Sequence, residues 1–392
     1  MKQFKRRGIY VHIPFCVRKC EYCDFLSMTA VRRERQAYAQ ALTAQLQLYA
    51  RDTRDMVFDT LYIGGGTPSV LESELMEPIL WLLQTQFRWR PEAEKSIEVN
   101  PGSIEPEKAR LYRQFGLNRI SMGAQSMQAE ELKLLGRIHT AGQVAESVHV
   151  IREAGFTNIN IDLMYALPGQ TIDSFFESVR QIIALEPQHI SAYSLIIEEG
   201  TPFFGLYAAD ELARRQGRRP QQLPNEDEER EMAKQVVAWL AKAGYRQYEV
   251  SNFAKPGYHC RHNVDCWQLQ EYLGIGLGAA GFWQGRRFRQ PTDWQTYLSR
   301  AGLVGPGEVA DWEACSKKSL QEEFMFLGLR LTDGVSGSEF AERFGESLHA
   351  VYGRVIERLM RKGLLEERCG RLRLTAAGHD ISSFVLTDFL QD

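Results

Sequence analysis

The segment GIYVHIPFCVRKCEYC, residues 8–23, decides the fold of this chain, because an apolar run leads directly into three closely spaced cysteines. The run from Gly8 to Ile13 is typical of a buried first strand. Cys16, Cys20 and Cys23 follow it with three and two residues between them. Thiolates in that number and spacing wrap a metal centre, so the sequence predicts a metal-binding loop at the end of the first strand.

Three thiolates leave one iron of a four-iron cube without a protein ligand. A chelating small molecule can bind that iron, and the amino and carboxylate groups of S-adenosylmethionine suit the position. The alternative is a structural zinc site, which requires a fourth protein ligand. The residues after Cys23 offer only the carboxylate of Asp24 for that role. The spacing therefore favours iron–sulfur over zinc or buried structural thiols.

The composition is ordinary for a soluble globular protein. The 392 residues are 44% hydrophobic and 25% charged, with a net charge of −3, which gives no general case for binding nucleic acid or an anionic membrane. His12 and Pro14 interrupt the first apolar run, so a signal peptide is not expected, and no run reaches the roughly 18 apolar residues of a membrane span. We expect a cytoplasmic protein without an integral membrane segment.

The first 200 residues alternate short apolar runs with longer amphipathic stretches, a pattern typical of parallel βα units. We expect an α/β fold, a partial (β/α)6 barrel, with its site at the carboxyl ends of the strands. The expected strands are 8–13, 60–63, 95–99, 119–122, 158–163 and 189–195. The expected helices between them are 35–50, 72–86, 106–115, 141–154 and 171–185.

Three regions are expected along the chain. Residues 1–205 form the barrel, 206–311 extend it, and 312–392 form a helical unit that resembles a winged helix. Within the extension, 206–231 is polar and is expected to be a solvated surface segment. Basic residues in the last region alternate with Glu357, Glu366 and Glu367, which argues against nucleic-acid binding.

Polar residues follow several of the expected strands. Glu98, Gln125, Arg137 and Asp162 could together hold an amino group, ribose hydroxyls and a carboxylate, which are the polar groups of S-adenosylmethionine. Each residue alone is more often a surface or capping residue, but as a set at successive strand ends they favour a ligand site. The triple glycine Gly64–Gly66 allows close approach of a ligand to the backbone, or else makes a tight turn.

A second glycine-rich segment, 274–281, contains Gly276-x-Gly278-x-x-Gly281 and matches the dinucleotide-binding fingerprint. The preceding residues, 267–273, show no clear strand pattern, so the βαβ context of that fingerprint is missing. Close packing of backbone at the barrel mouth explains these glycines better than a nucleotide site.

The loop predicted at 259–267 contains four possible metal ligands, His259, Cys260, His262 and Cys266. Three interpretations remain open. All four residues could bind zinc, although they are crowded for a tetrahedron. His262 or Cys266 could ligate haem iron while Trp267 packs on the macrocycle. The segment could also be a loop whose polar side chains cap neighbouring backbone.

Several motifs resemble the radical S-adenosylmethionine superfamily, and more narrowly the branch of oxygen-independent coproporphyrinogen III oxidase and its haem-chaperone relatives of the HemW type. The resemblance covers nearly the whole chain. The motifs are residues 10–25, 64–69, 98–101, 121–126, 135–137, 160–170, 248–254 and 262–263.

This resemblance implies that Cys16, Cys20 and Cys23 ligate a 4Fe–4S cluster whose open iron binds S-adenosylmethionine. Tyr22 would pack beside the cluster. The positions that match the S-adenosylmethionine contacts of the family are Tyr10, Gly65, Gly66, Thr67, Glu98, Gln125, Arg137 and Asp162.

Two features place the chain with the haem chaperones within that branch. The oxidase has a fourth cysteine two positions after the third, where this chain has Phe25, and a longer extension before its first strand. The chaperones typically show His-Asn-x-x-Tyr-Trp, whereas this chain has Cys266 in the tyrosine position. His262 therefore carries over as the haem residue, with Cys266 as a substitute ligand.

The expected function is therefore binding of haem and its transfer to apo-haemoproteins, with membrane-bound respiratory enzymes among the recipients that the resemblance suggests. The expected cofactors are a 4Fe–4S cluster, S-adenosylmethionine and haem. The alternative is oxidative decarboxylation of coproporphyrinogen III to protoporphyrinogen IX, an activity that the branch features disfavour. A third class, a transcriptional regulator, is disfavoured by the charge balance.

Overall fold

The computed structural model of the chain describes residues 6–306 and 312–390. Its main feature is a twelve-stranded open sheet in the order β12-β11-β10-β9-β1-β2-β3-β4-β5-β6-β8-β7. The parallel strands are β1 (Arg7–Ile13), β2 (Val57–Gly65), β3 (Arg88–Val99), β4 (Arg119–Gln125), β5 (Ile159–Tyr165), β6 (His189–Ser194) and β9 (Glu271–Ile275). The antiparallel strands at the two edges are β7 (Arg246–Gln247), β8 (Asn252–Ala254), β10 (Ala280–Trp283), β11 (Arg286–Arg289) and β12 (Glu313–Ala314).

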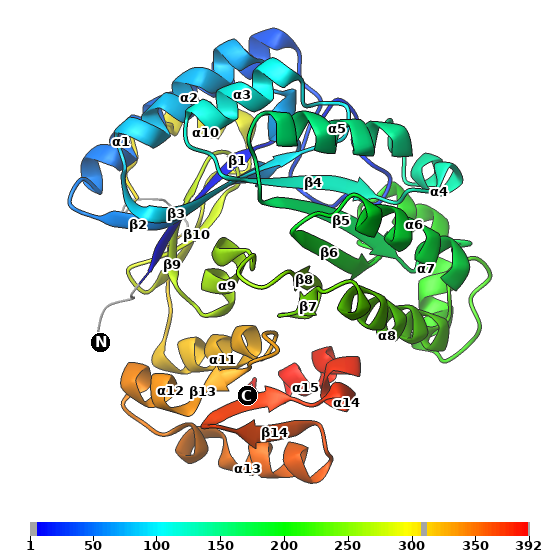
Figure 1. Cartoon of the computed structure of the whole chain (residues 1–392). Coiled ribbons are helices and arrows are strands. Elements are labelled where there is room, and N and C mark those ends of the chain that lie inside the picture. The colour runs from blue at the N-terminus through cyan, green and yellow to red at the C-terminus, as the bar shows by residue number, and fades with distance from the viewer. Residues whose placement is uncertain (1–5, 307–311, 391–392) are drawn as a thin grey trace.

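The six predicted barrel strands are confirmed, and β1 to β6 lie side by side in chain order. Right-handed crossovers through helices account for that order, because parallel neighbours cannot be joined by tight turns. The helices curve over the outer face of the sheet (Figure 1). They are α1 (Arg32–Asp52), α2 (Ser73–Thr85), α3 (Pro106–Gln114), α4 (Ala129–Leu134), α5 (Ala141–Glu153), α6 (Ile172–Ala184) and α10 (Trp294–Arg300).

Helix α6 shows why these segments are helical. Thr171 caps its first turn, because the side-chain oxygen accepts a hydrogen bond from the backbone N–H of Ser174 at 3.1 Å. Phe175, Val179 and Ile182 recur at helical spacing and are fully buried. The apolar side of the helix therefore packs on the sheet, and its capped end starts directly after the loop that follows β5.

The prediction that residues 267–273 lack a strand is wrong, because β9 begins at Glu271 and pairs in parallel with β1. The rejection of a dinucleotide site still holds for a different reason. Strand β9 turns directly into antiparallel β10, with no helix between them. Gly276 has φ +107°, and a Cβ there would lie 2.5 Å from the carbonyl oxygen of His12, which confirms close packing at the barrel mouth.

The polar segment 206–231 is not simply solvated surface, and that prediction is wrong for its first half. Residues Pro202–Arg215 form α7, in which Tyr207 and Asp210 are buried. The carboxylate of Asp210 accepts hydrogen bonds from the backbone N–H groups of residues 221, 222 and 223 at 3.0, 2.6 and 3.0 Å. This contact folds the chain back toward the next helix.

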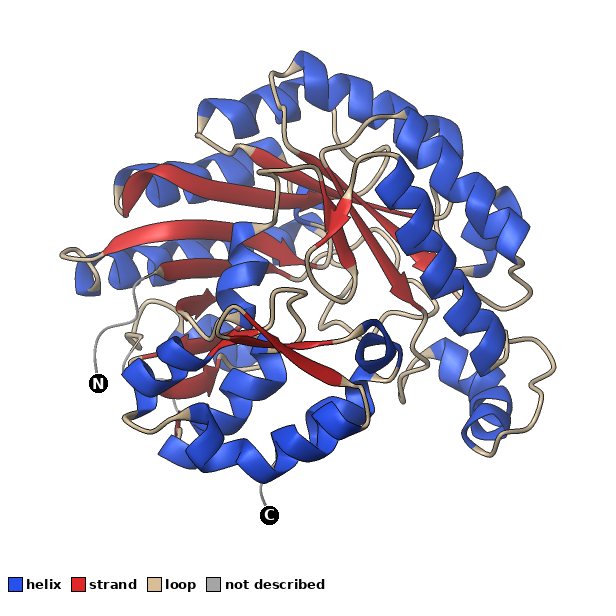
Figure 2. Ribbon diagram, turned by 60° about the horizontal axis from the view of Figure 1, so that its bottom comes forward, coloured by secondary structure: helices blue, strands red, loops and turns tan. Residues whose placement is uncertain are grey.

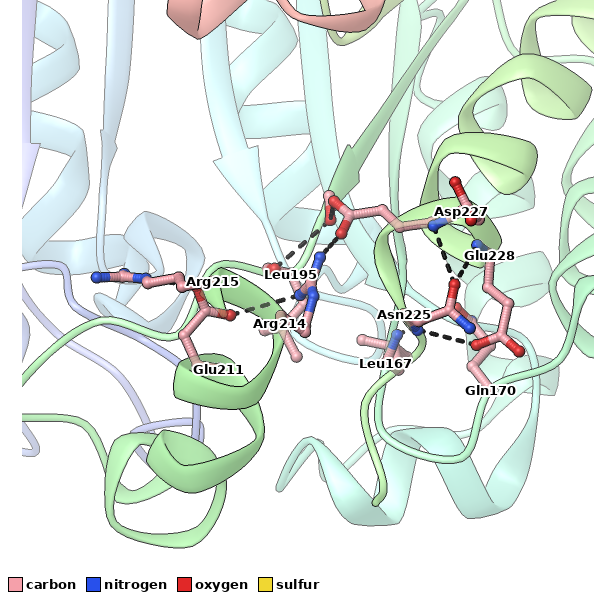
Figure 3. Close-up of polar contacts among 11 residues, drawn as sticks. Leu167, Gln170, Leu195, Glu211, Arg214, Arg215, Asn225, Asp227 and Glu228 are labelled. Carbon is pink, nitrogen blue, oxygen red and sulfur yellow. Dashed lines mark hydrogen bonds and ion pairs between the residues drawn. The ribbon is translucent and has the colours of Figure 1, made fainter. Parts of the chain in front are cut away.

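The chain continues into the helix α8 (Glu226–Lys242). The side-chain oxygen of Asn225 caps it by accepting from the N–H of Asp227 at 2.9 Å, and the Asn225 N–H donates to the carboxylate of Glu228 at 2.9 Å (Figure 3). Arg214 of α7 forms ion pairs with Glu211 and with Glu229 of α8. The two helices are thus held against each other at the edge of the barrel.

The last region packs around a second hydrophobic cluster, which also includes Leu269 and Phe282 of the barrel, and lies across the open side of the barrel (Figures 1 and 2). Its order of helix, short strand, two helices and hairpin is that of a winged helix, as predicted. The elements are α11 (Lys317–Gly328), β13 (Val335–Ser336), α12 (Gly337–Phe344), α13 (Leu348–Arg361), β14 (Leu365–Arg368), β15 (Arg371–Leu374), α14 (Ala376–Asp380) and α15 (Ser382–Thr387). The boundary predicted after residue 311 falls at residues 307–311, which lie outside the described part of the chain.

Helix α9 (Arg261–Trp267) lies between the barrel and this last region. The segment 259–267 is predicted to be a loop, so most of that prediction is wrong.

No helix in the described ranges has both the length and the apolar character needed to cross a lipid bilayer.

We predict that Asp210→Ala lowers the free energy of unfolding by about 1–3 kcal/mol, because three backbone donors lose their acceptor. Burial alone would raise the pKa of Asp210, but these donors outweigh it and hold the pKa below its ordinary value. The contribution is therefore present above the unfolded-state pKa and is lost as the pH falls through the folded-state pKa. Urea denaturation at pH 7 and below pH 4 measures the loss of stability and its dependence on pH. The control is Asp227→Ala, at an exposed position. A difference that persisted at the lower pH would contradict this account.

Candidate functional site at the carboxyl ends of the strands

The cysteine loop leaves the carboxyl end of β1 and is held there by its own backbone. The N–H of Cys16 donates to the carbonyl oxygen of Met28 at 2.9 Å, and the N–H of Met28 donates to Pro14 at 2.8 Å. His12 Nε2 lies 2.9 Å from the carbonyl oxygen of Leu26, while His12 Nδ1 lies 2.9 Å from the Tyr10 hydroxyl. A neutral ring that donates to Leu26 and accepts from Tyr10 satisfies both contacts, and burial lowers the pKa of His12 accordingly.

The three thiols are partly exposed and lie beside polar partners. Cys16 Sγ lies 3.6 Å from Thr67 Oγ1, and the guanidinium of Arg137 donates to Cys20 Sγ at 3.5 Å. Burial raises the pKa of Cys16 and of Cys23, and the neighbouring cysteines add to the increase. A positive charge beside the sulfurs, from Arg137 or from bound metal, favours the thiolate forms that ligate iron.

Hydrogen bonds through Asn100 join Thr67 and Arg137, the polar partners of the sulfurs. Asn100, directly after β3, donates to Thr67 Oγ1 at 2.8 Å and accepts from Arg137 at 2.8 Å. Asn100 was not among the predicted site residues, although it stands two residues after Glu98 at the same strand end. A cavity of about 300 Å³ is lined by Asn100, Thr67, Arg137 and Cys20, next to the cysteine loop.

The triple glycine Gly64–Gly66, at the end of β2, allows neighbouring side chains and backbone of the protein to pack closely against it. A Cβ on Gly64 would lie 2.9 Å from a carboxylate oxygen of Glu98, and one on Gly65 would lie 2.6 Å from the His12 ring. A Cβ on Gly66 would lie 2.7 Å from the carbonyl oxygen of Phe15. The glycines therefore let the end of β2 press against the start of the cysteine loop.

Glu98 and Asp162 are partly buried acids inside the barrel. Tyr62 donates to one Glu98 oxygen at 2.8 Å, and the Gly65 N–H donates to the other at 3.1 Å. Burial raises the pKa of Glu98 to about 7 against these hydrogen bonds, and Asp162 adds to the increase. Burial also raises the pKa of Asp162, which accepts from Asn160 at 2.6 Å. A cationic group placed between these acids would offset their burial.

The remaining predicted residues complete the same end of the barrel. Gln125 ends β4 with φ +68° and accepts a hydrogen bond from Tyr193 at 2.7 Å. Tyr22 packs against Phe203, with ring centroids 6.4 Å apart. The structure thus brings together at the carboxyl ends the residues predicted to bind the cluster and S-adenosylmethionine. The donor set fits both groups, because it offers three thiols in one loop, a cavity lined by Cys20 and Arg137, and partly buried acids at the neighbouring strand ends.

His262 lies at the opposite end of the barrel. Its side chain is only 6% exposed, its Nδ1 lies 3.0 Å from Thr60 Oγ1, and its ring stacks on Tyr62 with centroids 5.4 Å apart. Burial, with Arg119 nearby, lowers the pKa of His262 to about 4. Burial also raises the pKa of Cys266 to about 12. In this arrangement the His262 ring fills the interior of the barrel between Thr60 and Tyr62. Haem ligation by His262 or Cys266 stays a prediction.

Within the described ranges, no three side chains of histidine, cysteine, aspartate or glutamate are placed so that they could hold one metal ion. The zinc interpretation of His259, Cys260, His262 and Cys266 therefore has no support from the geometry. The finding covers the cysteine loop as well, and it disfavours the single zinc ion that was the alternative there.

Comparison with known proteins gives consistent matches. Residues 10–182 match the family described as the radical SAM superfamily, and residues 315–381 match the HemN C-terminal domain. The chain is 38% identical over 389 residues to the heme chaperone HemW of Lactococcus lactis subsp. lactis, covering 99% of this chain and 98% of that protein. It is 33% identical over 385 residues to heme chaperone HemW of Bacillus subtilis, covering 98% and 99%.

Among solved structures, the coproporphyrinogen III oxidase HemN from Escherichia coli, described as a radical SAM enzyme, superimposes with a TM-score of 0.83. The match covers 98% of this chain and 90% of that chain at 22% identity. At that identity the likeness establishes the fold.

We predict that Gly66→Ala impairs assembly of the cluster, because its methyl group would meet the Phe15 backbone at the start of the cysteine loop. A close-packed contact of this kind has little room to relax, so we expect iron and sulfide per chain after anaerobic reconstitution to fall by about half or more. The control is Gly205→Ala, at a glycine without a positive φ and with no neighbour within 4 Å of the added methyl. Equal iron content in Gly66→Ala and wild type would contradict this role.

We predict that His262→Ala lowers the free energy of unfolding by about 2–4 kcal/mol, since it removes a buried ring and a buried hydrogen-bond partner. Chemical denaturation measures the change. His149→Ala, at an exposed position on α5, should change it by less than about 0.5 kcal/mol. A His262→Ala protein as stable as wild type would show that the buried ring does not stabilise the fold.

Proposed function

Because the chain belongs to the HemW family of radical SAM proteins, we propose that it binds haem and transfers it to apo-haemoproteins. The single observation that carries the proposal is the near full-length similarity to proteins named heme chaperone HemW, at 38% and 33% identity. The branch features agree with it, since the residue in the position of the oxidase's fourth cysteine is Phe25, whose side chain is 69% exposed.

The carboxyl end of the barrel has its own part in this proposal. Cys16, Cys20 and Cys23 hold a 4Fe–4S cluster, which would offer one open iron to S-adenosylmethionine. The residues proposed to contact S-adenosylmethionine are Tyr10, Tyr22, Gly65, Gly66, Thr67, Glu98, Gln125, Arg137 and Asp162. The raised pKa of Glu98 supports a cationic partner there, because a nearby amino group restores the ionised carboxylate.

The role of each polar group follows from its contacts. Arg137 spans Cys20 and Asn100 and so fixes the loop against two neighbouring strands. His12 ties the loop to β1 through the carbonyl oxygen of Leu26. In the proposed function these contacts keep a binding or regulatory cluster in place, and haem is the cargo that the chain delivers.

A haem titration tests this function. We expect the Soret band of the full chain to saturate near one haem per chain, with a dissociation constant on the order of micromolar or tighter. Haem-loaded protein mixed with a purified apo-haemoprotein should then pass on its haem, with a rise in the recipient's spectrum. Saturation far above micromolar, or retention of all haem, would contradict the proposal.

The alternative activity has its own assay. Anaerobically reconstituted protein is incubated with reductant, S-adenosylmethionine and coproporphyrinogen III, and we expect no product. Formation of protoporphyrinogen IX would assign oxidase activity to the chain instead.

A further inference from the structure

A cleft of about 400 Å³ lies between the barrel and the winged-helix region. One wall consists of Arg6, directly before β1, and residues 267–270, directly before β9. The other wall comes from α11, α12 and β15. Because β1 and β9 are parallel, this cleft is at the amino ends of the strands, opposite the cysteine loop. Figure 1 shows α11 below β9 and α9, where the two regions meet.

The walls of the cleft are largely apolar. Trp267 and Leu269 contribute from the barrel side, and Leu320, Phe324 and Phe344 contribute from the winged-helix side. Leu269 packs in one buried cluster with Phe324 and Phe344, so the two walls of the cleft meet at these side chains. Such a cleft has the size and the character of a site for a flat apolar ligand.

The cleft also carries an excess of positive charge, with four cationic side chains and two carboxylates along its lining. Arg371 donates to the carbonyl oxygens of Asp333 and Gly334 at 2.9 and 2.7 Å. These bonds orient its guanidinium, and no carboxylate of the described ranges lies within ion-pair distance of it. Arg343 donates to the carbonyl oxygens of residues 268 and 269 at 3.4 and 3.3 Å. Both cations are therefore fixed by the backbone at the edge of an apolar cleft.

Cys315 is the one residue of the described lining whose side chain is a common ligand of haem iron. It is partly buried, and its N–H donates to the carbonyl oxygen of Gly285 at 3.3 Å, in the turn between β10 and β11. The backbone of Cys315 is thus attached to the barrel edge, and the residue borders the cleft. His262 and Cys266 do not line this cleft, whereas their neighbour Trp267 does.

We propose that this cleft is the haem site, with the macrocycle between its apolar walls, the two propionates at Arg371 and Arg343, and the iron on the sulfur of Cys315. Two cations fixed at the rim match the two carboxylates of haem. On coordination, an Fe–S bond forms, and the thiol proton passes to solvent. Burial, with Glu323 nearby, raises the pKa of Cys315, so iron must displace that proton. This inference rests on the proposed function.

The test is a haem titration of the full chain as wild type, Arg371→Glu and Cys315→Ala, followed in the Soret region. For Arg371→Glu we expect the dissociation constant to rise about tenfold or more, since a propionate would face a carboxylate. For Cys315→Ala we expect an altered Soret maximum and weaker haem binding. Binding of metal-free protoporphyrin IX, followed by its fluorescence, should be unchanged in Cys315→Ala, because that ligand has no iron.

Two control variants make the same chemical changes outside the cleft. Arg368→Glu lies opposite Arg371 on β14, and Cys369→Ala removes an exposed cysteine of the same hairpin; both should bind haem as wild type does. Wild-type haem affinity in both cleft variants would overturn the assignment of the site and leave the proposed function standing. Absence of haem binding by the wild-type chain would overturn the proposed function and this inference together.

Discussion

The parallel pairing of β1 with β2 on one side and β9 on the other fixes which groups can meet at each end of the barrel. The carboxyl end of β1 leads into Cys16, Cys20 and Cys23, and the amino end of β1 follows Arg6 beside the cleft. Gly66 allows the end of β2 to approach β1 closely, and the Gly66 N–H donates to the carbonyl oxygen of Ile13 at 2.9 Å. A shift of β1 along its neighbours would displace both ends, so one register holds the cluster loop and the cleft wall.

The arrangement separates the two proposed sites along the strands. β2 runs between the two ends of the barrel: Thr60 contacts His262 near its amino end, and Tyr62 both stacks on that ring and donates to Glu98. The interior between the ends is thus filled by polar contacts. In the proposed function the cluster end would support or regulate the chain, while the haem would be held at the other end.

Local pattern was enough to predict the six barrel strands, the helices between them and the winged helix, because each has apolar spacing of its own. Strand β9 was missed because its segment, EYLGI, carries a glycine and an acid, and it is a strand only through its pairing with β1. Helix α9 was missed for a related reason: its seven residues show no apolar stripe. The burial of His262 depends on Thr60 and Tyr62, which are distant in the sequence, so its position could not be predicted from its motif. Asn100 could have been included from its place at a strand end beside Glu98.

Anomalous diffraction at the iron absorption edge, from crystals of the reconstituted and haem-loaded chain, locates both kinds of iron. We predict two separate iron positions at opposite ends of the parallel strands, one beside Cys16, Cys20 and Cys23 and one beside Cys315. A haem iron located next to the cysteine loop would contradict the two-ended arrangement, and one at His262 would contradict the assignment to Cys315. Crystals that contain only the cluster iron after loading with haem would contradict haem binding itself.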